Sequence, residues 1–291
     1  MSDTGGFPLS FGSSQFSGKN NRTRVQGNAW GWENVVQAPM SAAFGYRNIV
    51  SSSNSFAFGQ NNVISTNAQS AFCSGSSNTH QSPYSITVGI NNINSATYGA
   101  CFGYNGTVSG SYAFGAGTSY TASGILSTGF GRSWVASRQG EFVHSAGNIL
   151  VSGDCQHGWL VAFNQTTSST PTVLYLDGPG ATNKLPILGA GTRWGVTVEI
   201  VAATTGAINK SARFVRSFQI DRPTTAASTT LVGSVQTIGT DTGTNAGSPP
   251  AGWAVSITAD TTNGAPQFQV TGDTDTINWT AAIHYVQTIR V

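Results

Sequence analysis

Charged residues are scarce in this chain of 291 residues. Asp, Glu, Lys and Arg together make up 8% of it, and the formal net charge is +2. Proteins whose main task is to bind phosphate backbones carry clustered Lys and Arg side chains. The sequence has no such basic run, so we expect no nucleic-acid partner. Gly, Ser, Thr and Asn are abundant instead, which predicts a polar surface with few ions.

Long apolar runs are missing as well. No segment approaches the length of apolar chain that crosses a bilayer, and residues 1–20 lack the basic start and apolar core of a secretion signal. We therefore expect no membrane insertion, and synthesis in a cytoplasm without a signal peptide. The three cysteines, an odd number, also lack the spacing of metal ligands.

A short pattern recurs along residues 27–131: Ser, a variable residue, a small residue, an apolar residue and Gly, as in 41–45, 55–59, 85–89 and 111–115. Its glycines recur about every 14 residues, which is within the range of solenoid repeats. Asn often follows three residues after the glycine. The glycines are Gly31, Gly45, Gly59, Gly75, Gly89, Gly103, Gly115 and Gly131, and the asparagines are Asn34, Asn48, Asn62, Asn78 and Asn92.

This spacing predicts one coil of a parallel β-solenoid per repeat. Two short strands and two tight corners use about 14 residues, and Gly and Asn tolerate the positive φ that corners need. Residues before each glycine alternate between a large apolar face and a small face. We expect the apolar face (Phe44, Phe58, Val88, Phe102, Phe114, Phe130) to fill the coil. The small face (Ala43, Ala57, Cys73, Thr87, Cys101, Ala113, Gly129) is then outside.

A small outer face has two consequences. It lets neighbouring chains approach closely, which predicts a symmetric homo-oligomer along the solenoid axis. Cys73 and Cys101 occupy the same repeat position two coils apart, which places them on the order of 10 Å from each other. That distance is too long for a disulfide, so we expect buried free thiols.

The repeat resembles the head repeat of trimeric adhesins of the YadA type, over residues 27–140. The resemblance rests on the Ser-x-small-apolar-Gly pattern and the following Asn. It implies a left-handed parallel β-roll in which three chains pack side by side as a homotrimer.

The period ends after Gly131. Residues 132–153 hold more charges and are predicted to be a junction that caps the roll.

Residues 154–291 contain longer alternating strands between turn residues, which predicts an antiparallel β-sandwich of jelly-roll type without amphipathic helices. We expect Trp194, Trp253 and Trp279 in its core. The predicted strands are 159–163, 172–176, 195–202, 212–220, 230–238, 253–259, 267–271 and 277–289.

Residues 135–291 resemble a C-terminal domain of bacteriophage tail-fibre and structural proteins. The motifs that support this resemblance are residues 138–141, 153–156, 174–178, 192–194, 259–265 and 270–272, together with Trp279. The two resemblances imply a phage tail fibre, a receptor-binding protein of the virion whose trimeric tip adheres to a host surface polysaccharide. Residues 1–26 are either flexible or attach to a phage tail or baseplate protein, with Phe7, Phe11 and Phe16 as anchors.

Weakly charged surfaces with exposed aromatic residues suit sugars, because aromatic rings stack on sugar faces and polar side chains supply hydrogen bonds. Trp159 follows His157 at a strand start, and Tyr175 precedes the Asp177 turn. We predict that the receptor-binding residues at the tip are His157, Trp159, Tyr175, Asp177, Asn183 and Lys184.

No catalytic residues, metal site or cofactor are expected. Some phage spikes cleave polysaccharide with a carboxylate pair, but most acids here lie in turns, and Glu141 and Asp154 at the junction favour capping roles. A metal held by His144 and His157 at a trimer axis is disfavoured. Two alternatives stay open: a tailspike that depolymerises polysaccharide, and a structural baseplate or decoration protein that binds no receptor.

Overall fold

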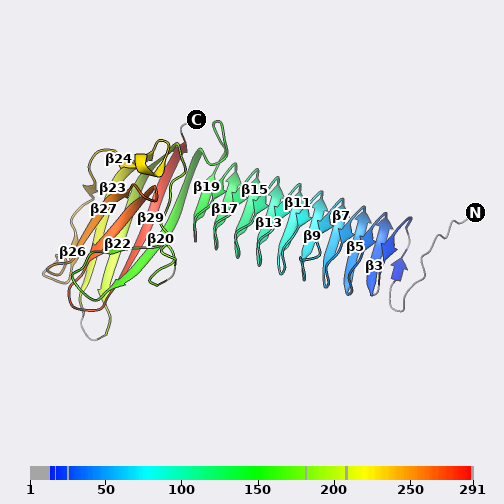
Figure 1. Ribbon diagram of the computed structural model, residues 1–291, viewed down its shortest axis with the longest axis horizontal. Coiled ribbons are helices and arrows are strands. Elements are labelled where there is room, and N and C mark those ends of the chain that lie inside the picture. Colours follow the sequence, from blue (N-terminus) through cyan, green and yellow to red (C-terminus); the bar gives the residue numbers. More distant parts are fainter. Residues whose placement is uncertain (1–13, 17, 25, 181, 207–208, 290–291) are drawn as a thin grey trace, which may run out of the picture. The chain divides into compact units, whose positions relative to one another are not determined.

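The computed structural model describes residues 14–16, 18–24, 26–180, 182–206 and 209–289 (Figure 1). The chain forms two compact units, Met1–Ser137 and Arg138–Val291, which we call the N-terminal and C-terminal units. The division falls within the predicted junction at 132–153. The anchors Phe7 and Phe11 lie outside the described residues, whereas Phe16 ends strand β1 (Ser14–Phe16). No helix in the described ranges is long and apolar enough to cross a membrane.

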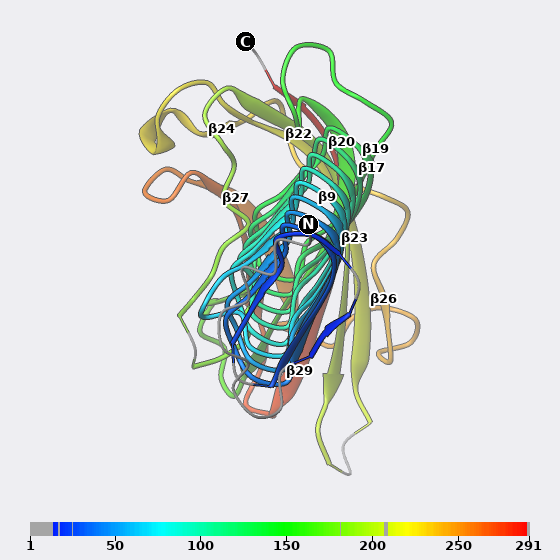
Figure 2. The same ribbon diagram turned by 90° about the vertical axis from the view of Figure 1, so that its right-hand side faces the viewer.

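The N-terminal unit is a parallel β-solenoid, as predicted. Its coils alternate a longer strand with a short one, and each strand pairs in parallel with its equivalent in the next coil (Figures 1 and 2). The longer strands after β1 are β3 (Gly27–Trp32), β5 (Ser41–Tyr46), β7 (Phe56–Gln60), β9 (Phe72–Ser76), β11 (Ile86–Ile90), β13 (Ala100–Tyr104), β15 (Phe114–Thr118) and β17 (Thr128–Arg132). The nine short strands are β2 (Arg22–Thr23), β4 (Val35–Val36), β6 (Ile49–Val50), β8 (Val63–Ile64), β10 (Thr79–His80), β12 (Ile93–Asn94), β14 (Thr107–Val108), β16 (Thr121–Ala122) and β18 (Val135–Ala136).

One glycine per coil is the next-to-last residue of each longer strand, just before the corner. Gly103 pairs with Gly117, and Gly117 pairs with Gly131. The predicted position of Gly115 in this column is therefore wrong by two residues. The column glycine adopts positive φ, and a Cβ on Gly45 would lie 2.0 Å from the carbonyl oxygen of Gly59. Only glycine fits there, because the next coil's backbone occupies that space.

The predicted inside and outside of the coil are reversed. The small residues point inward, with Ala43, Ala57 and Cys73 fully buried. The large apolar residues point outward, where Phe44 and Phe58 stack face to face at 4.7 Å and remain half-buried. In these coils the longer strand can turn only small side chains inward, because Val50 and Ile64 from the short strands fill the rest of the narrow interior. The prediction of an oligomer was based on a small outer face, and that basis is lost. The outer face instead carries a column of large apolar side chains, including Phe44 and Phe58.

Two large side chains fill the coil where the inward residue is glycine. A Cβ on Gly115 would lie 2.2 Å from the Tyr120 ring, and one on Gly129 would lie 2.5 Å from the Trp134 ring. Tyr120 and Trp134 are buried and stack on each other at 4.6 Å. Large and small residues thus complement each other in volume in the last coils, at native-like packing.

A ladder of buried asparagines runs through the earlier coils. Asn48 donates to the side-chain oxygen of Asn34 and to the backbone carbonyls of Phe44 and Gly59. Asn62 and Asn78 repeat this arrangement in later coils, whereas Asn92 donates to the Asn78 side-chain oxygen through its backbone amide and to the Gly103 carbonyl through its side chain. Each amide satisfies backbone groups at a corner that would otherwise be buried without partners, which is why a polar residue is stable there.

Cys73 and Cys101 occupy equivalent positions on either side of Thr87 in the register of β9, β11 and β13. Both are free and fully buried, which confirms the prediction for this pair. Burial raises the pKa of Cys73 to about 12 and that of Cys101 to about 11, so both thiols stay protonated at neutral pH.

The C-terminal unit contains two antiparallel sheets. The larger has five main strands in the order β19 (Phe142–Ser145), β20 (Cys155–Thr166), β29 (Ile277–Ile289), β22 (Thr192–Thr204) and β23 (Ser211–Arg222), with β24 (Thr230–Leu231), β25 (Gln236–Thr237) and β26 (Thr242–Gly243) along β23. The smaller contains β21 (Thr172–Val173), β28 (Ala265–Thr271) and β27 (Ala254–Asp260). A single-turn 3-10 helix, Ala226–Ser228, precedes β24.

The two sheets share one hydrophobic core. Trp194 and Trp279 from the larger sheet pack in the same cluster as Phe268 from the smaller one and Trp253 beside it. The prediction that all three tryptophans belong to the core is confirmed. Most predicted strands are present, but the strand predicted at 230–238 is two short strands, and only Thr172–Val173 is a strand within 172–176.

Candidate functional site

An aromatic and histidine surface lies on the side of the larger sheet that faces away from the core. Strand alternation turns Leu160 and Ala162 inward and leaves Trp159 exposed. Antiparallel pairing places Phe142 opposite Trp159 on one side and His284 opposite it on the other. In the next row, His144 is opposite His157.

The rings in these rows touch one another. Trp159 stacks on His284 at a ring distance of 5.3 Å, and His157 and Phe142 pack edgewise or tilted against it at 4.8 and 5.2 Å. His157 Nε2 lies 3.3 Å from His144 Nδ1. We call Phe142, His144, His157, Trp159 and His284 the aromatic surface. It is held by three paired strands, so its side chains are positioned before any ligand binds.

His157 in the aromatic surface favours the neutral state. Partial burial lowers the pKa of His157, and the positive charges that His144 and His284 carry when protonated lower it further. At neutral pH, His157 therefore offers one nitrogen donor and one acceptor to a ligand. In the parts of the chain that the structure describes, no three His, Cys, Asp or Glu residues are arranged to hold a metal ion.

Apolar side chains extend the aromatic surface along the same face. Val161 and Phe163 continue β20, and Val286 lies opposite His157 on β29, all of them exposed. A sheet face of this kind suits a ligand that has both apolar C–H groups and hydroxyls.

The other four predicted residues lie elsewhere, in and before the loop 177–184. The Asp177 carboxylate accepts hydrogen bonds from the Thr182 amide and hydroxyl and from the Lys184 amide, at 2.7–2.8 Å. Partial burial opposes ionisation of Asp177, but these hydrogen bonds outweigh it and lower its pKa. Asp177 therefore organises the loop, where Asn183 adopts positive φ.

Lys184 and Tyr175 also have structural contacts. Lys184 donates to the Gln139 side chain at 2.8 Å, and the Tyr175 carbonyl accepts a hydrogen bond from the Phe163 amide at 2.9 Å. Within the described part of the chain, no hydrogen bond or ring contact joins His157 or Trp159 to Asp177 or Lys184. A receptor-binding role for the loop stays a prediction.

The carboxylates at the predicted junction support the fold. Glu141 is fully buried, pairs with the Arg138 guanidinium and accepts a hydrogen bond from the Tyr285 hydroxyl. Arg138 also lies over the Trp194 ring, 4.4 Å from its centre. Asp154 accepts hydrogen bonds from the Ile149, Leu150 and Val151 amides. Both acids cap and pair, as the sequence favoured.

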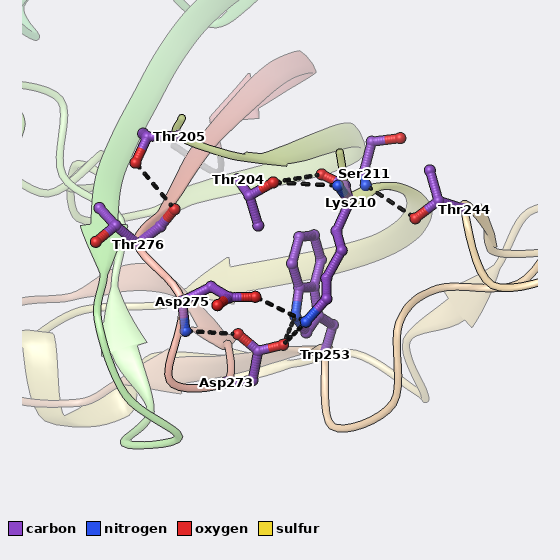
Figure 3. A network of polar contacts seen from close by, with 9 residues as sticks. All are labelled: Thr204, Thr205, Lys210, Ser211, Thr244, Trp253, Asp273, Asp275 and Thr276. Carbon is purple, nitrogen blue, oxygen red and sulfur yellow. Dashed lines mark hydrogen bonds and ion pairs between the residues drawn. The ribbon is translucent and has the colours of Figure 1, made fainter. Parts of the chain in front are cut away.

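Two neighbouring aspartates share one lysine as their ion-pair partner. Lys210 Nζ lies 3.0 Å from Asp273 and 2.7 Å from Asp275, and the Trp253 indole donates to Asp273 at 3.0 Å (Figure 3). The hydrogen bonds that Lys210 donates to both aspartates raise its pKa. Figure 3 also shows Thr204 bonded to Lys210, and Ser211 to Thr244, so the cluster joins neighbouring strand ends.

Comparisons with known proteins give few matches. No protein-family model matches the chain, and no curated protein matches it significantly. The tailspike protein of Acinetobacter phage vB_ApiP_P1 aligns with 90% of this chain and 50% of its own at 9% identity and a TM-score of 0.25. The Acinetobacter baumannii phage AM24 tailspike aligns with 92% and 54% at 10% identity and 0.26. The chain spans about half the length of each, and such TM-scores are too low to relate the folds.

Proposed function

We propose that this chain is a bacteriophage receptor-binding protein, a tail-fibre component that adheres to a glycan on the host cell surface. The observation that carries the proposal is the exposed Trp159 ring, stacked on His284 and flanked by Phe142 and His157 on a rigid sheet. Indole faces stack on the apolar side of sugar rings, and imidazole nitrogens bond to sugar hydroxyls. Adhesion requires no reaction step.

The proposal includes a homotrimer of left-handed rolls packed side by side, each followed by a jelly-roll sandwich. The outward apolar column of the solenoid supports this association, because Trp30, Phe44 and Phe58 form one continuous row of contacting rings. Three equivalent and individually weak sites would bind a repetitive polysaccharide with high avidity.

Placement on the virion follows from the same proposal. Residues 1–26 would attach the fibre to a phage tail or baseplate protein, and the C-terminal unit would face the host. The support for this part is the resemblance of the repeat to adhesin heads and of residues 135–291 to phage fibre domains.

A direct experiment separates this function from its two alternatives. Purified full-length chain is incubated with a panel of bacterial capsular and O-antigen polysaccharides, and both binding and polysaccharide mass are followed by light scattering after size-exclusion chromatography. Adhesion predicts a complex with polysaccharide of unchanged mass. A fall in polysaccharide mass would identify a depolymerase, and absence of any complex would favour a structural protein.

A further inference from the structure

Three exposed tyrosines form a ladder along one corner of the solenoid. Tyr84, Tyr98 and Tyr112 each precede a longer strand, and all three adopt positive φ, between 56° and 60°. Their rings stack nearly parallel, at 5.2 Å for the first pair and 5.0 Å for the second. Each ring is about half exposed, at 50%, 50% and 57%.

The ladder stops at Ser70, which occupies the same corner one coil earlier. The backbone register shows this equivalence, because the Tyr84 amide donates to the Gln69 carbonyl just as the Tyr98 amide donates to the Pro83 carbonyl. Ser70 also adopts positive φ, at 57°. Its side chain is a single hydroxymethyl group, so the place where a fourth ring would stack on Tyr84 is left open.

A shallow, largely open groove lies beside this open place. It has a volume of about 350 Å³ and is lined by Ser70, Tyr84, Ser85, Ile86, Tyr98, Gly99 and Ala100. Ligand sites in proteins usually have volumes of roughly 300–1,000 Å³, so the groove has room for a small ring and its substituents. On the strands, Ile86 and Ala100 stand between the larger Phe72 and Phe114 in the same row, which bound the groove along the solenoid axis.

The groove offers hydroxyl groups, aromatic surface and no ions. Tyr84, Tyr98 and Ser70 supply hydroxyls, while the backbone amide of Ile86 is already bonded to Gly99. No Asp, Glu, Lys or Arg occurs in the sequence between Arg47 and Arg132. An acidic or basic ligand would find no counter-ion in this part of the solenoid. A neutral ring with one apolar face and peripheral hydroxyls matches the lining.

We propose that this groove binds one pyranose ring of a neutral glycan, stacked on the free face of Tyr84 above Ser70. The sugar takes the position of the missing fourth ring, and one of its hydroxyls bonds to the Ser70 hydroxyl. This site belongs to the N-terminal unit and does not depend on the aromatic surface. It extends the proposed function from one glycan contact to two contacts per chain.

Two substitutions test the site as a matched pair. Ser70→Tyr adds the fourth ring and fills the groove, whereas Leu126→Tyr adds a ring at the other end of the ladder and leaves the groove open. Leu126 has the same positive φ, at 60°, and is exposed. Tyrosine is accepted at this corner in three coils, so both variants should fold, which circular dichroism and thermal unfolding check.

Binding is measured on an array of neutral oligosaccharides of glucose, galactose, mannose and N-acetylglucosamine, followed by calorimetric titration of the strongest ligand. All variants carry Trp159→Ala, so the aromatic surface does not contribute. We expect Ser70→Tyr to weaken binding about tenfold or more, as for loss of a stacked ring and its hydrogen bonds, and Leu126→Tyr to leave it within about twofold. Equal affinity of both variants, or no binding by the Trp159→Ala chain to any array sugar, would overturn the proposal.

Discussion

The Tyr120 hydroxyl donates a hydrogen bond to the Gly115 carbonyl at 2.9 Å, while the Tyr120 ring occupies the space where a Cβ on Gly115 would lie. Glycine is therefore required here because it has no side chain, and not because of its φ, which is one that any residue can adopt. The same hydroxyl accepts a hydrogen bond from the Phe102 amide at 2.9 Å, so one side chain ties two coils together.

Gly115→Ala should destabilise the N-terminal unit by about 1–3 kcal/mol, because the new methyl group would lie 2.2 Å from the Tyr120 ring. Chemical denaturation of the full chain measures the loss. The control is the same substitution in a Tyr120→Ala background, where the ring is absent and the added cost should nearly vanish. An equal cost in both backgrounds would contradict the steric explanation.

His80 should make the solenoid sensitive to acid. It is fully buried, its ring nitrogens lie 2.6 Å from the Ser85 hydroxyl and 2.8 Å from the Thr87 hydroxyl, and burial lowers its pKa to about 4. The unfolded chain binds this proton near pH 6.5, so unfolding becomes easier as pH falls from about 6.5 to about 4. The expected loss in the free energy of unfolding from this group is about 3 kcal/mol.

The matched control for this prediction is His80→Asn, since Asn94 occupies the equivalent position in the next coil. Denaturation curves at pH 7 and pH 4 are compared for the two proteins. The asparagine variant should lose about 3 kcal/mol less on acidification than the natural chain. Equal losses would mean that His80 is not the acid-sensitive group.

Glu141→Gln should destabilise the C-terminal unit by about 3–5 kcal/mol, because it leaves the buried Arg138 guanidinium without its counter-ion. Glu199→Gln, which breaks the exposed pair with Arg213, should cost less than about 1 kcal/mol. Thermal unfolding of both variants gives the comparison. Similar losses of stability in the two variants would show that burial does not determine how much each ion pair contributes to folding.

The outward apolar column predicts the oligomeric state. Light scattering of the natural chain should give three times its mass of 30.2 kDa. Phe58→Glu, which places a charge in the stacked column, should shift the protein to monomer, whereas Val63→Glu on the outward side of the short strand β8 should leave the mass unchanged. If the natural chain is a monomer, the proposed side-by-side homotrimer is wrong.

The sequence predicted the solenoid correctly because backbone geometry fixes the glycine column: the next coil's carbonyl excludes a side chain at Gly45. It did not predict which strand face lies inside. Alternation shows that a strand has two different faces, but the inward face depends on how wide the coil is, and alternation carries no information about that width. Gly115 fits the Ser-x-small-apolar-Gly pattern, whereas Gly117 fits the 14-residue spacing, and the pairing of Gly103 with Gly117 decides between them.

The candidate site was predicted in part for a similar reason. His157 and Trp159 are recognisable as alternate residues of one strand. His284, however, reaches Trp159 through antiparallel pairing of strands far apart in the sequence. No local pattern indicates such a pairing, so the third histidine was missed. The Phe142 and His144 alternation in β19 was a usable signal for the other side of the surface.

Binding of Trp159→Ala and Val161→Ala to a bacterial surface polysaccharide tests the central claim most directly. Both side chains are exposed on the same face of β20, but only Trp159 belongs to the ring cluster. We predict that Trp159→Ala weakens binding of the full chain about tenfold or more, while Val161→Ala stays within about threefold of the natural chain. Unchanged affinity of the Trp159→Ala chain would contradict adhesion through the aromatic surface.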